Sequence, residues 1–230
     1  NQLEDEIQAR EDFVAAFAHE LKTPLTSIIG YADALRSRRL DEEKQFMSAN
    51  YIYTEGKRLE AMSFRLLDIM VTRRGEVEFT MVSAESLFLY LYDMYVINKS
   101  MKIYFNYDDG MVRAEANLIK SVLMNLLDNA FKASEADGLI EVYGHLMKDG
   151  YCFEVKDHGV GIPKEELHKI TKAFYMVDKS RSRSRNGAGL GLALCAEILE
   201  LHKSRLNIRS ELGKGTTMSF TLPLWKEDQL

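Results

Sequence analysis

The sequence predicts a helical hairpin that pairs as a four-helix bundle in a dimer, followed by an α/β sandwich with a mixed sheet. Two observations support this prediction. Only two of the 14 glycines and one of the three prolines precede residue 74, so the composition changes there. Before that point the apolar residues recur at helical spacing, and after it they mark strands that alternate with helices. We therefore predict two domains, 1–73 and 74–230.

Two apolar stripes predict the hairpin. At 100° per residue, the first stripe falls within an arc of about 80° on one helix. The second has alternating spacings of three and four residues, as in the seam of a helical bundle. Residues 38–40 predict a tight connection, with Asp41 as the N-cap of the second helix. Because two helices cannot bury both stripes alone, we expect a two-fold dimer. The stripes comprise Leu3, Ile7, Val14, Phe17, Leu21, Leu25, Ile28, Ala32 and Leu35, and Ala49, Ile52, Gly56, Leu59, Ser63, Leu66 and Met70.

Shorter elements predict the second domain. Strands are indicated at 77–81, 102–107, 138–147, 151–157, 205–210 and 216–222. Helices are indicated at 83–98, 114–134 and 189–202. Short turns containing glycine join two of the strand pairs, which we expect to form hairpins. Antiparallel pairs with helices between them favour an α/β sandwich over a doubly wound parallel sheet.

The composition narrows the function. The chain has 46% hydrophobic and 28% charged residues, as in ordinary globular proteins. Its net charge of −5 argues against a nucleic-acid binder, and its two cysteines form no CxxC motif, which argues against a disulfide framework or a zinc site. No signal peptide or membrane span is indicated. Because the first residue is not Met, we expect a piece of a longer protein, with any membrane span outside it.

His19 is the most informative residue of the first domain. It lies about 160° from the centre of the first stripe, so a continuous helix places it in solvent. Thr23 stands where the HExxH zinc motif needs its second histidine. Glu20 can orient the imidazole, which is a good nucleophile when neutral, and Pro24 should bend the helix just beyond it. From the spacing alone, a solvated histidine without a catalytic role is the simpler interpretation.

A pair of amides in the second domain suits a nucleotide. Asn125 and Asn129 are four residues apart on one helix, with Asp128 and Lys132 beside them. Two amides on one helix face, with a lysine one turn further, suit hydrated Mg²⁺ and phosphate oxygens. Alone, such a pair is more often part of a solvated polar face.

Two glycine motifs follow. Asp157 ends a strand, and Gly159 and Gly161 would let a ligand approach the backbone, although a plain strand-to-helix turn explains them too. Residues 187–192 open a helix whose free N–H groups can face phosphates, although the GxGxG spacing does not match the dinucleotide fingerprint. The basic run at 179–185 lies between the two motifs. It suits a lid over a triphosphate better than a nucleic-acid patch, which would have interleaved aromatic residues.

Taken together, these motifs resemble the transmitter core of bacterial sensor histidine kinases. Five motifs of that family occur in its order: the histidine, asparagine, first glycine, phenylalanine and second glycine boxes. The resemblance covers nearly the whole chain and reverses the interpretation of His19. The residues that carry it are His19 to Leu25, Asn125, Asn129, Ala130, Lys132, Asp157, Gly159, Gly161, Phe174, Tyr175, Gly187 and Gly189 to Leu192.

The resemblance implies a dimerisation and histidine-phosphotransfer domain at 1–73 and a Bergerat-type ATP-binding domain at 74–230. His19 would accept the γ-phosphoryl group of ATP on Nε2, with Glu20 polarising the ring and Thr23 orienting water for dephosphorylation of the partner. Asp157 would bind the adenine amino group, and Asn129 would hold Mg²⁺. The other implied nucleotide contacts are Asn125, Lys132, Gly159, Gly161, Phe174, Tyr175, Lys179, Arg181, Gly187, Gly189, Leu190 and Gly191.

The implied partners are a second copy of the chain and the receiver domain of a response regulator. The implied location is cytoplasmic, in a parent protein anchored at the membrane. Ala18, Met176 and Asn186 depart from the usual family pattern, and none replaces a residue that the chemistry requires. Two alternatives remain: an ATPase clamp of the same fold, and a dimer module without catalysis.

Overall fold

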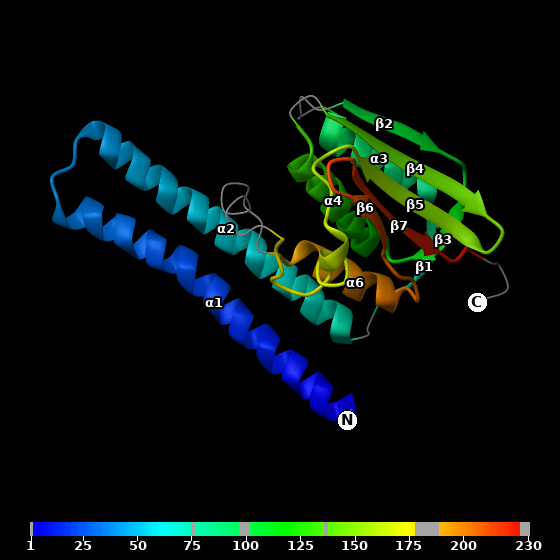
Figure 1. Ribbon diagram of the computed structural model, residues 1–230, viewed down its shortest axis with the longest axis horizontal. Helices are drawn as coiled ribbons and strands as arrows, with labels where there is room; N and C mark the ends of the chain where they lie inside the picture. Colours follow the sequence, from blue (N-terminus) through cyan, green and yellow to red (C-terminus); the bar gives the residue numbers. More distant parts are fainter. Residues whose placement is uncertain (1, 75–76, 97–101, 136–137, 178–188, 226–230) are drawn as a thin grey trace.

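The computed structural model describes residues 2–74, 77–96, 102–135, 138–177 and 189–225. Two long antiparallel helices, α1 (Gln2–Ser37) and α2 (Glu42–Arg74), form a hairpin that extends to one side of the molecule (Figure 1). Asp41 caps α2, since its Oδ1 accepts a hydrogen bond of 2.9 Å from the Lys44 amide. Helix α1 continues through the buried Pro24. The hairpin and its connection are therefore as predicted.

The second unit is a five-stranded sheet with helices on one face (Figure 1). The strand order is β2-β4-β5-β7-β6, with β2 and β4 parallel and the other pairs antiparallel, so the sheet is mixed. The strands are β2 (Lys102–Tyr107), β4 (Leu139–Met147), β5 (Gly150–Asp157), β6 (Asn207–Glu211) and β7 (Gly215–Leu222). The helices are α3 (Ala84–Val96), α4 (Ala116–Ala133) and α6 (Gly191–Leu201), with a short 3-10 turn, η1 (Lys164–Glu166).

A small second sheet differs from the sequence prediction. The strand expected at 77–81 begins only at Thr80, as β1 (Thr80–Ser83). It pairs antiparallel with β3 (Met111–Ala114), which the sequence pattern did not indicate. β3 has only four residues and runs directly into the cap of α4, where the Glu115 carboxylate accepts a hydrogen bond of 2.6 Å from the Leu118 amide. The helical pattern of the following residues therefore hid a strand too short to show alternation of its own.

The core of the second unit lies between the sheet and its helices. Aromatic rings form its centre: Phe153 of β5 lies 5.7 Å from Phe88 of α3 and 5.1 Å from Phe220 of β7, both stacked. Gly144 is required beneath them, because a Cβ there would lie 2.7 Å from Phe88 Cζ. Burial of these apolar surfaces is the main force that holds helices and sheet together. This core therefore holds in place the helices and strands that carry the candidate site.

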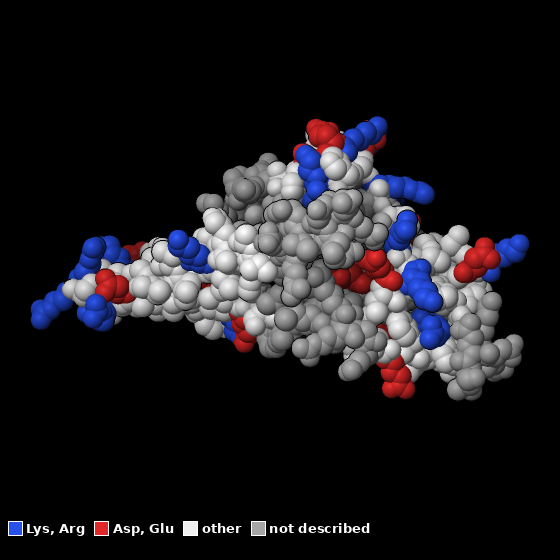
Figure 2. All heavy atoms as spheres, turned by 90° about the horizontal axis from the view of Figure 1, so that it is seen from below, with Lys and Arg blue, Asp and Glu red and all other residues white. Residues whose placement is uncertain are grey.

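The hairpin contacts this unit and leaves part of its own apolar surface open. Met62 of α2 is 2% exposed and belongs to the core, and α2 packs beside α6 (Figure 1). In contrast, Val14, Leu25 and Ile29 share one side of α1 and are 58%, 50% and 59% exposed. Between its tip and the second unit, the hairpin shows few charged side chains in Figure 2. This side of α1 has no cover within the described part of one chain.

His202 joins the ends of two helices inside the fold. Its Nδ1 donates to the Ile198 carbonyl oxygen at 2.7 Å, and its Nε2 accepts from the Glu115 amide at 3.1 Å. The residue is 3% exposed, and burial lowers the pKa of its imidazole. Only the neutral ring can make both hydrogen bonds, since a protonated Nε2 cannot accept.

We therefore expect the free energy of unfolding to fall as the pH drops below about 6.5, the ordinary pKa of histidine. In that range the unfolded chain binds a proton that folded His202 does not, at up to about 1.4 kcal/mol per pH unit. Urea unfolding between pH 5.5 and 8 measures this slope, which His202→Asn should reduce. The exposed His145→Gln should leave it unchanged, and equal slopes for all three proteins would contradict the expectation.

Candidate active site

His19 lies on α1 with its side chain exposed to solvent, as predicted. One turn further, the Thr23 hydroxyl donates to the His19 carbonyl oxygen at 3.4 Å, so Thr23 lies beside His19 on the helix surface. The side chain of Glu20 falls outside the part of the chain that the structure describes. An exposed imidazole on a rigid helix is open to a reacting group from another domain or protein.

Helix α4 carries the predicted asparagine pair at the border of its buried face, where both residues are half-buried. The Asn125 amide nitrogen donates to the Ser121 carbonyl oxygen at 2.9 Å. The Asn129 amide nitrogen is buried and has no hydrogen-bond partner among the residues that the structure describes. Leaving such a group unpaired costs about 1–3 kcal/mol, so it marks a place where a ligand would complete the hydrogen bonding. Lys132, one turn further along α4, is half-buried.

Asp128, the residue before Asn129, differs from it because its carboxylate is hydrogen-bonded within the protein. The Tyr95 hydroxyl of α3 donates to Asp128 Oδ1 at 2.8 Å and lies 3.2 Å from the Met124 carbonyl oxygen. The Tyr95 ring also stacks on Phe131 at 5.4 Å. Asp128 therefore links α4 to α3 beside the asparagine pair.

Asp157 ends β5 and is 6% exposed. Its Oδ1 accepts hydrogen bonds from the Gly159 amide at 2.8 Å and from the Thr216 amide at 3.2 Å. Burial raises the pKa of the carboxyl group above its ordinary value, although these two hydrogen bonds and the neighbouring His158 act in the opposite direction. A buried carboxylate held in one orientation suits recognition of a hydrogen-bond donor on a ligand.

Gly159 and Gly161 are required for the packing of protein segments, and their predicted contact with a nucleotide stays a prediction. A Cβ on Gly159 would collide with the Ala133 carbonyl oxygen at the end of α4, and one on Gly161 with the Glu211 carbonyl oxygen of β6. Gly161 also has φ +68°, which favours glycine. The close approach is therefore between protein segments. The residue between the glycines, Val160, accepts from Gly213 at 2.8 Å and donates to the Ala133 carbonyl oxygen at 3.1 Å.

The phenylalanine box and the second glycine box also contact each other. The Phe174 amide donates to the Gly189 carbonyl oxygen at 2.9 Å, and both residues have positive φ, 63° and 66°. A Cβ on Gly189 would lie 2.9 Å from Phe174 Cα, and one on Gly191 would lie 2.8 Å from Asn125 Oδ1. The asparagine, phenylalanine and second glycine boxes thus meet at the start of α6.

The remaining predicted residues of this region divide into two groups. Leu190 is fully buried in the core, and Tyr175 is half-buried with the Lys169 ammonium 5.9 Å from its ring centre. Lys179, Arg181 and Gly187, with the rest of the basic run, lie outside the described residues. The predicted lid stays a prediction.

A contact that the sequence did not indicate connects this region to α1. The rings of Phe17 and Phe174 lie 6.2 Å apart at an angle of 50°. Phe17 and Leu21 both pack against the buried core cluster, which includes Met62 of α2 as well as residues of the second unit. The sequence assigned both residues to the apolar stripe of a bundle, and the spacing of that stripe cannot separate residues that face another helix from residues that face another domain.

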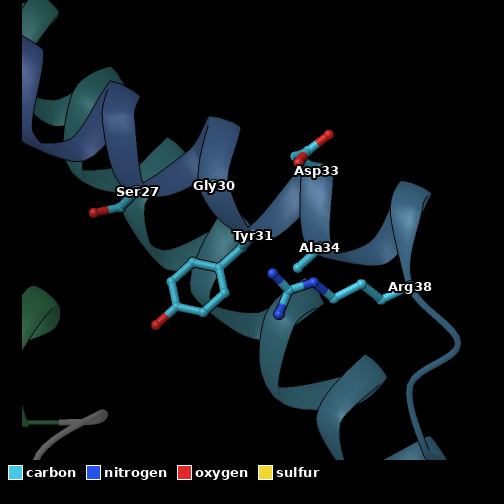
Figure 3. A pocket seen from close by; sticks show the side chains of 6 residues that line it. All are labelled: Ser27, Gly30, Tyr31, Asp33, Ala34 and Arg38. Carbon is cyan, nitrogen blue, oxygen red and sulfur yellow. The ribbon is translucent and has the colours of Figure 1, made fainter.

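A hollow on the hairpin lies apart from the nucleotide residues. Ser27, Gly30, Tyr31, Asp33, Ala34 and Arg38 line it, all from α1 and the turn that follows it (Figure 3). It begins two turns beyond His19. The Tyr31 ring stacks on Tyr51 of α2 with centres 4.7 Å apart, which holds the two helices together beneath it.

Two family models match the chain. Residues 9–70 match the His Kinase A (phospho-acceptor) domain. Residues 114–226 match the histidine kinase-, DNA gyrase B- and HSP90-like ATPase domain. The chain belongs to the sensor histidine kinases. The two matches fall on the hairpin and on the α/β sandwich of this kinase core, so the predicted fold class is confirmed.

Two of three sequence relatives of the kinase core are named as sensor histidine kinases. It is 32% identical to sensor histidine kinase WalK of Bacillus subtilis over 96% of its own length and 38% of the relative. It is 30% identical to YclK of the same species, over 99% of its length and 50% of the relative. A third relative, the non-motile and phage-resistance protein of Caulobacter vibrioides, is 30% identical over 96% of the kinase core and 28% of that protein. The kinase core therefore spans half or less of these three relatives.

Solved structures share the fold. Histidine kinase ThkA in complex with response regulator protein TrrA matches 99% of the kinase core and 67% of that chain, with a TM-score of 0.76 and 24% identity. Acinetobacter baumannii histidine kinase AdeS matches 90% of it and 98% of that chain, with a TM-score of 0.66 and 18% identity. No helix in the described ranges has the length and hydropathy needed to cross a bilayer.

Proposed function

We propose that this kinase core binds ATP with Mg²⁺, transfers the γ-phosphoryl group to His19 and passes it to an aspartate in the receiver domain of a response regulator. One observation carries the proposal: the unpartnered, buried Asn129 amide lies where the asparagine and glycine boxes meet, and Phe174 joins that region to the helix of His19. The matched families and a neighbour solved with a response regulator support it.

The donor set suits a magnesium nucleotide. Mg²⁺ prefers oxygen ligands and keeps several waters, so the amide oxygen of Asn129 with phosphate oxygens would be enough to hold it, with help from Asn125. When bound, the ion offsets the charge of the phosphates. Lys132 contributes a positive charge to the same oxygens, and Asp157 accepts a hydrogen bond from the adenine amino group. Gly189, Leu190 and Gly191 present backbone N–H groups at the start of α6.

The transfer step uses His19 as the nucleophile. The lone pair of neutral Nε2 forms a bond to the γ-phosphorus as the bond to the bridging oxygen breaks, and ADP leaves. In this proposal Glu20 polarises the ring, as the family resemblance implies. Thr23 lies one turn away from His19. It suits a separate dephosphorylation step, in which water removes the phosphoryl group from the partner. We also propose that Phe174, which contacts Phe17, holds the nucleotide domain against α1 before this step, with Tyr175 beside it.

We further propose that the hairpin dimerises. The exposed side of α1 formed by Val14, Leu25 and Ile29 would be buried in a four-helix bundle with a second copy. The hollow on α1 beyond His19 stays open in this arrangement and gives a receiver domain a surface to contact. In the longer parent protein, we place this segment on the cytoplasmic side of a membrane-anchored receptor.

Incubation with ATP labelled in the γ position tests the proposal. We expect label that is stable in base and labile in acid, as for phosphohistidine, and that moves to members of a panel of purified receiver domains. An Asn129→Asp protein should bind Mg-ATP more weakly. Sustained ATP hydrolysis without labelled protein would indicate an ATPase clamp instead, and no ATP binding at all would indicate a docking module.

A further inference from the structure

Glu141 binds both residues that flank Asp157 in the sequence. It lies on β4, on the face of the sheet opposite the helices. Its Oε1 is 2.9 Å from Lys156 Nζ and 2.7 Å from His158 Nε2. Its Oε2 accepts a hydrogen bond from the Tyr143 hydroxyl. The side chain is 14% exposed, so one largely buried carboxylate has three partners.

These hydrogen bonds keep the Glu141 carboxylate charged. The Tyr143 hydroxyl, then Lys156 and His158, lower the pKa of Glu141 to about 2. The contact with Lys156 is cross-strand, because the two residues are directly opposite in the pairing of β4 with β5. The contact with His158 extends past the end of β5. Glu141 therefore holds the residue just before Asp157 and the residue just after it.

The alternation of side chains along a strand gives this arrangement its effect. Consecutive residues of a strand point to opposite faces, so Lys156 lies on the open face and Asp157 points towards the helices. Asp157 pairs with the buried Ile140, which neighbours Glu141 on β4. The backbone turns away immediately after Asp157, at Gly159. The contacts of Glu141 with the residues before and after Asp157 therefore limit rotation of the peptide units that carry the Asp157 side chain.

We infer that Glu141 is a positioning residue for nucleotide recognition: by binding Lys156 and His158 from the open face of the sheet, it fixes the direction in which Asp157 points into the site. The inference rests on the proposed function, in which Asp157 accepts a hydrogen bond from adenine. Glu141 itself touches no nucleotide, because it lies on the other face of the sheet.

The sign of the change in ATP affinity distinguishes a positioning role of Glu141 from a simple effect of its negative charge. Replacing Glu141 by Gln removes a negative charge, and long-range attraction between the protein and a triphosphate then increases. A simple charge effect therefore strengthens ATP binding, whereas loss of positioning weakens it. The two effects have opposite signs, so the direction of the change identifies its cause.

The test measures binding of ATP and GTP by titration calorimetry to the whole chain. We expect Glu141→Gln to weaken ATP binding by roughly tenfold, at the low end of losses seen when an orienting residue is removed. GTP binding should change little, because guanine has a carbonyl oxygen where adenine has the 6-amino group that Asp157 would bind, so the ratio of the two affinities falls. The KM for ATP in His19 phosphorylation should rise by the same factor, with the rate at saturating ATP unchanged.

The matched control is Glu154→Gln. Glu154 lies on the same face of β5, opposite Tyr143, and its substitution removes the same charge without touching either tie to Asp157. We expect its ATP affinity to equal or exceed that of the natural protein. His158→Gln provides a second variant, since His158 is 47% exposed and its loss removes one tie without exposing the core. It should lower the ATP to GTP affinity ratio in the same direction.

Each outcome discriminates. If the natural protein binds no ATP, the proposed function fails. If it binds ATP and both Glu141→Gln and His158→Gln keep its affinity ratio, only the role of Glu141 is wrong. If affinities for ATP and GTP fall together, Glu141 supports the fold and does not position Asp157.

Discussion

His19→Gln is expected to abolish incorporation of the γ-phosphoryl group from ATP while leaving ATP binding intact. Glutamine is similar in size and polarity, but its amide nitrogen is not a nucleophile at neutral pH. Because His19 is exposed, the free energy of unfolding should change by less than about 0.5 kcal/mol. Any loss of phosphorylation is then caused by the missing nucleophile and not by unfolding. Labelled ATP measures phosphorylation, and calorimetry measures binding in the same preparation.

The control for this experiment is another exposed histidine. His168→Gln changes the same residue type near η1, away from α1, and should be phosphorylated like the natural protein. Acid-labile, base-stable phosphate on the His19→Gln protein would show that another residue is the acceptor. Loss of ATP binding by the same protein would show that α1 contributes to the nucleotide site.

Asp157→Asn is expected to weaken ATP binding by about 10- to 150-fold, the range that corresponds to a hydrogen bond with a charged group. The same substitution should stabilise the protein without nucleotide. The introduced amide can still accept from the Gly159 and Thr216 amides through its oxygen, whereas the buried negative charge is removed. A gain in stability with a loss of binding is the behaviour of a residue retained for its ligand.

The pH dependence of stability tests whether the buried charge of Asp157 is the cause of the difference. Because burial raises the pKa of Asp157 above its ordinary value, the folded protein binds a proton more readily than the unfolded chain. Its contribution to stability is therefore complete below the ordinary pKa and is lost as the pH rises through the folded pKa. The stability difference between Asp157→Asn and the natural protein should grow over that range. Urea unfolding at several pH values measures it, and a destabilised variant at pH 7 would contradict this account.

The large elements of the fold were predictable from periodicity. Local spacing of apolar residues is enough to predict three elements. These are the helical hairpin, the strand at 102–107 and the β-hairpin formed by β4 and β5. β3 was not predictable, because its four residues pair with β1, about thirty residues earlier in the chain, and not with a neighbour. The parallel pairing of β2 with β4 has the same cause: only the complete core decides which edges meet.

The site was predictable as a set of motifs but not as a geometry. Spacing indicated Asn125 and Asn129, yet only the structure separates them. The Asn125 amide nitrogen is bound within α4, and the Asn129 amide nitrogen has no partner in the described ranges. The glycines at 159 and 161 were expected to admit a ligand, and they admit backbone from α4 and β6. Glu141 gave no signal at all, because a glutamate on a strand has the pattern of any solvent-facing residue until its cross-strand partners are known.

The contact between Phe17 and Phe174 has a geometric consequence for catalysis. Residues two apart on an α-helix point about 160° away from each other, so the side of α1 that packs against the nucleotide domain through Phe17 is opposite to the side that carries His19. The helix cannot offer both sides to one domain at the same time. In this arrangement His19 therefore faces away from the domain, and the proposed transfer step requires α1 and the domain to change their relative orientation.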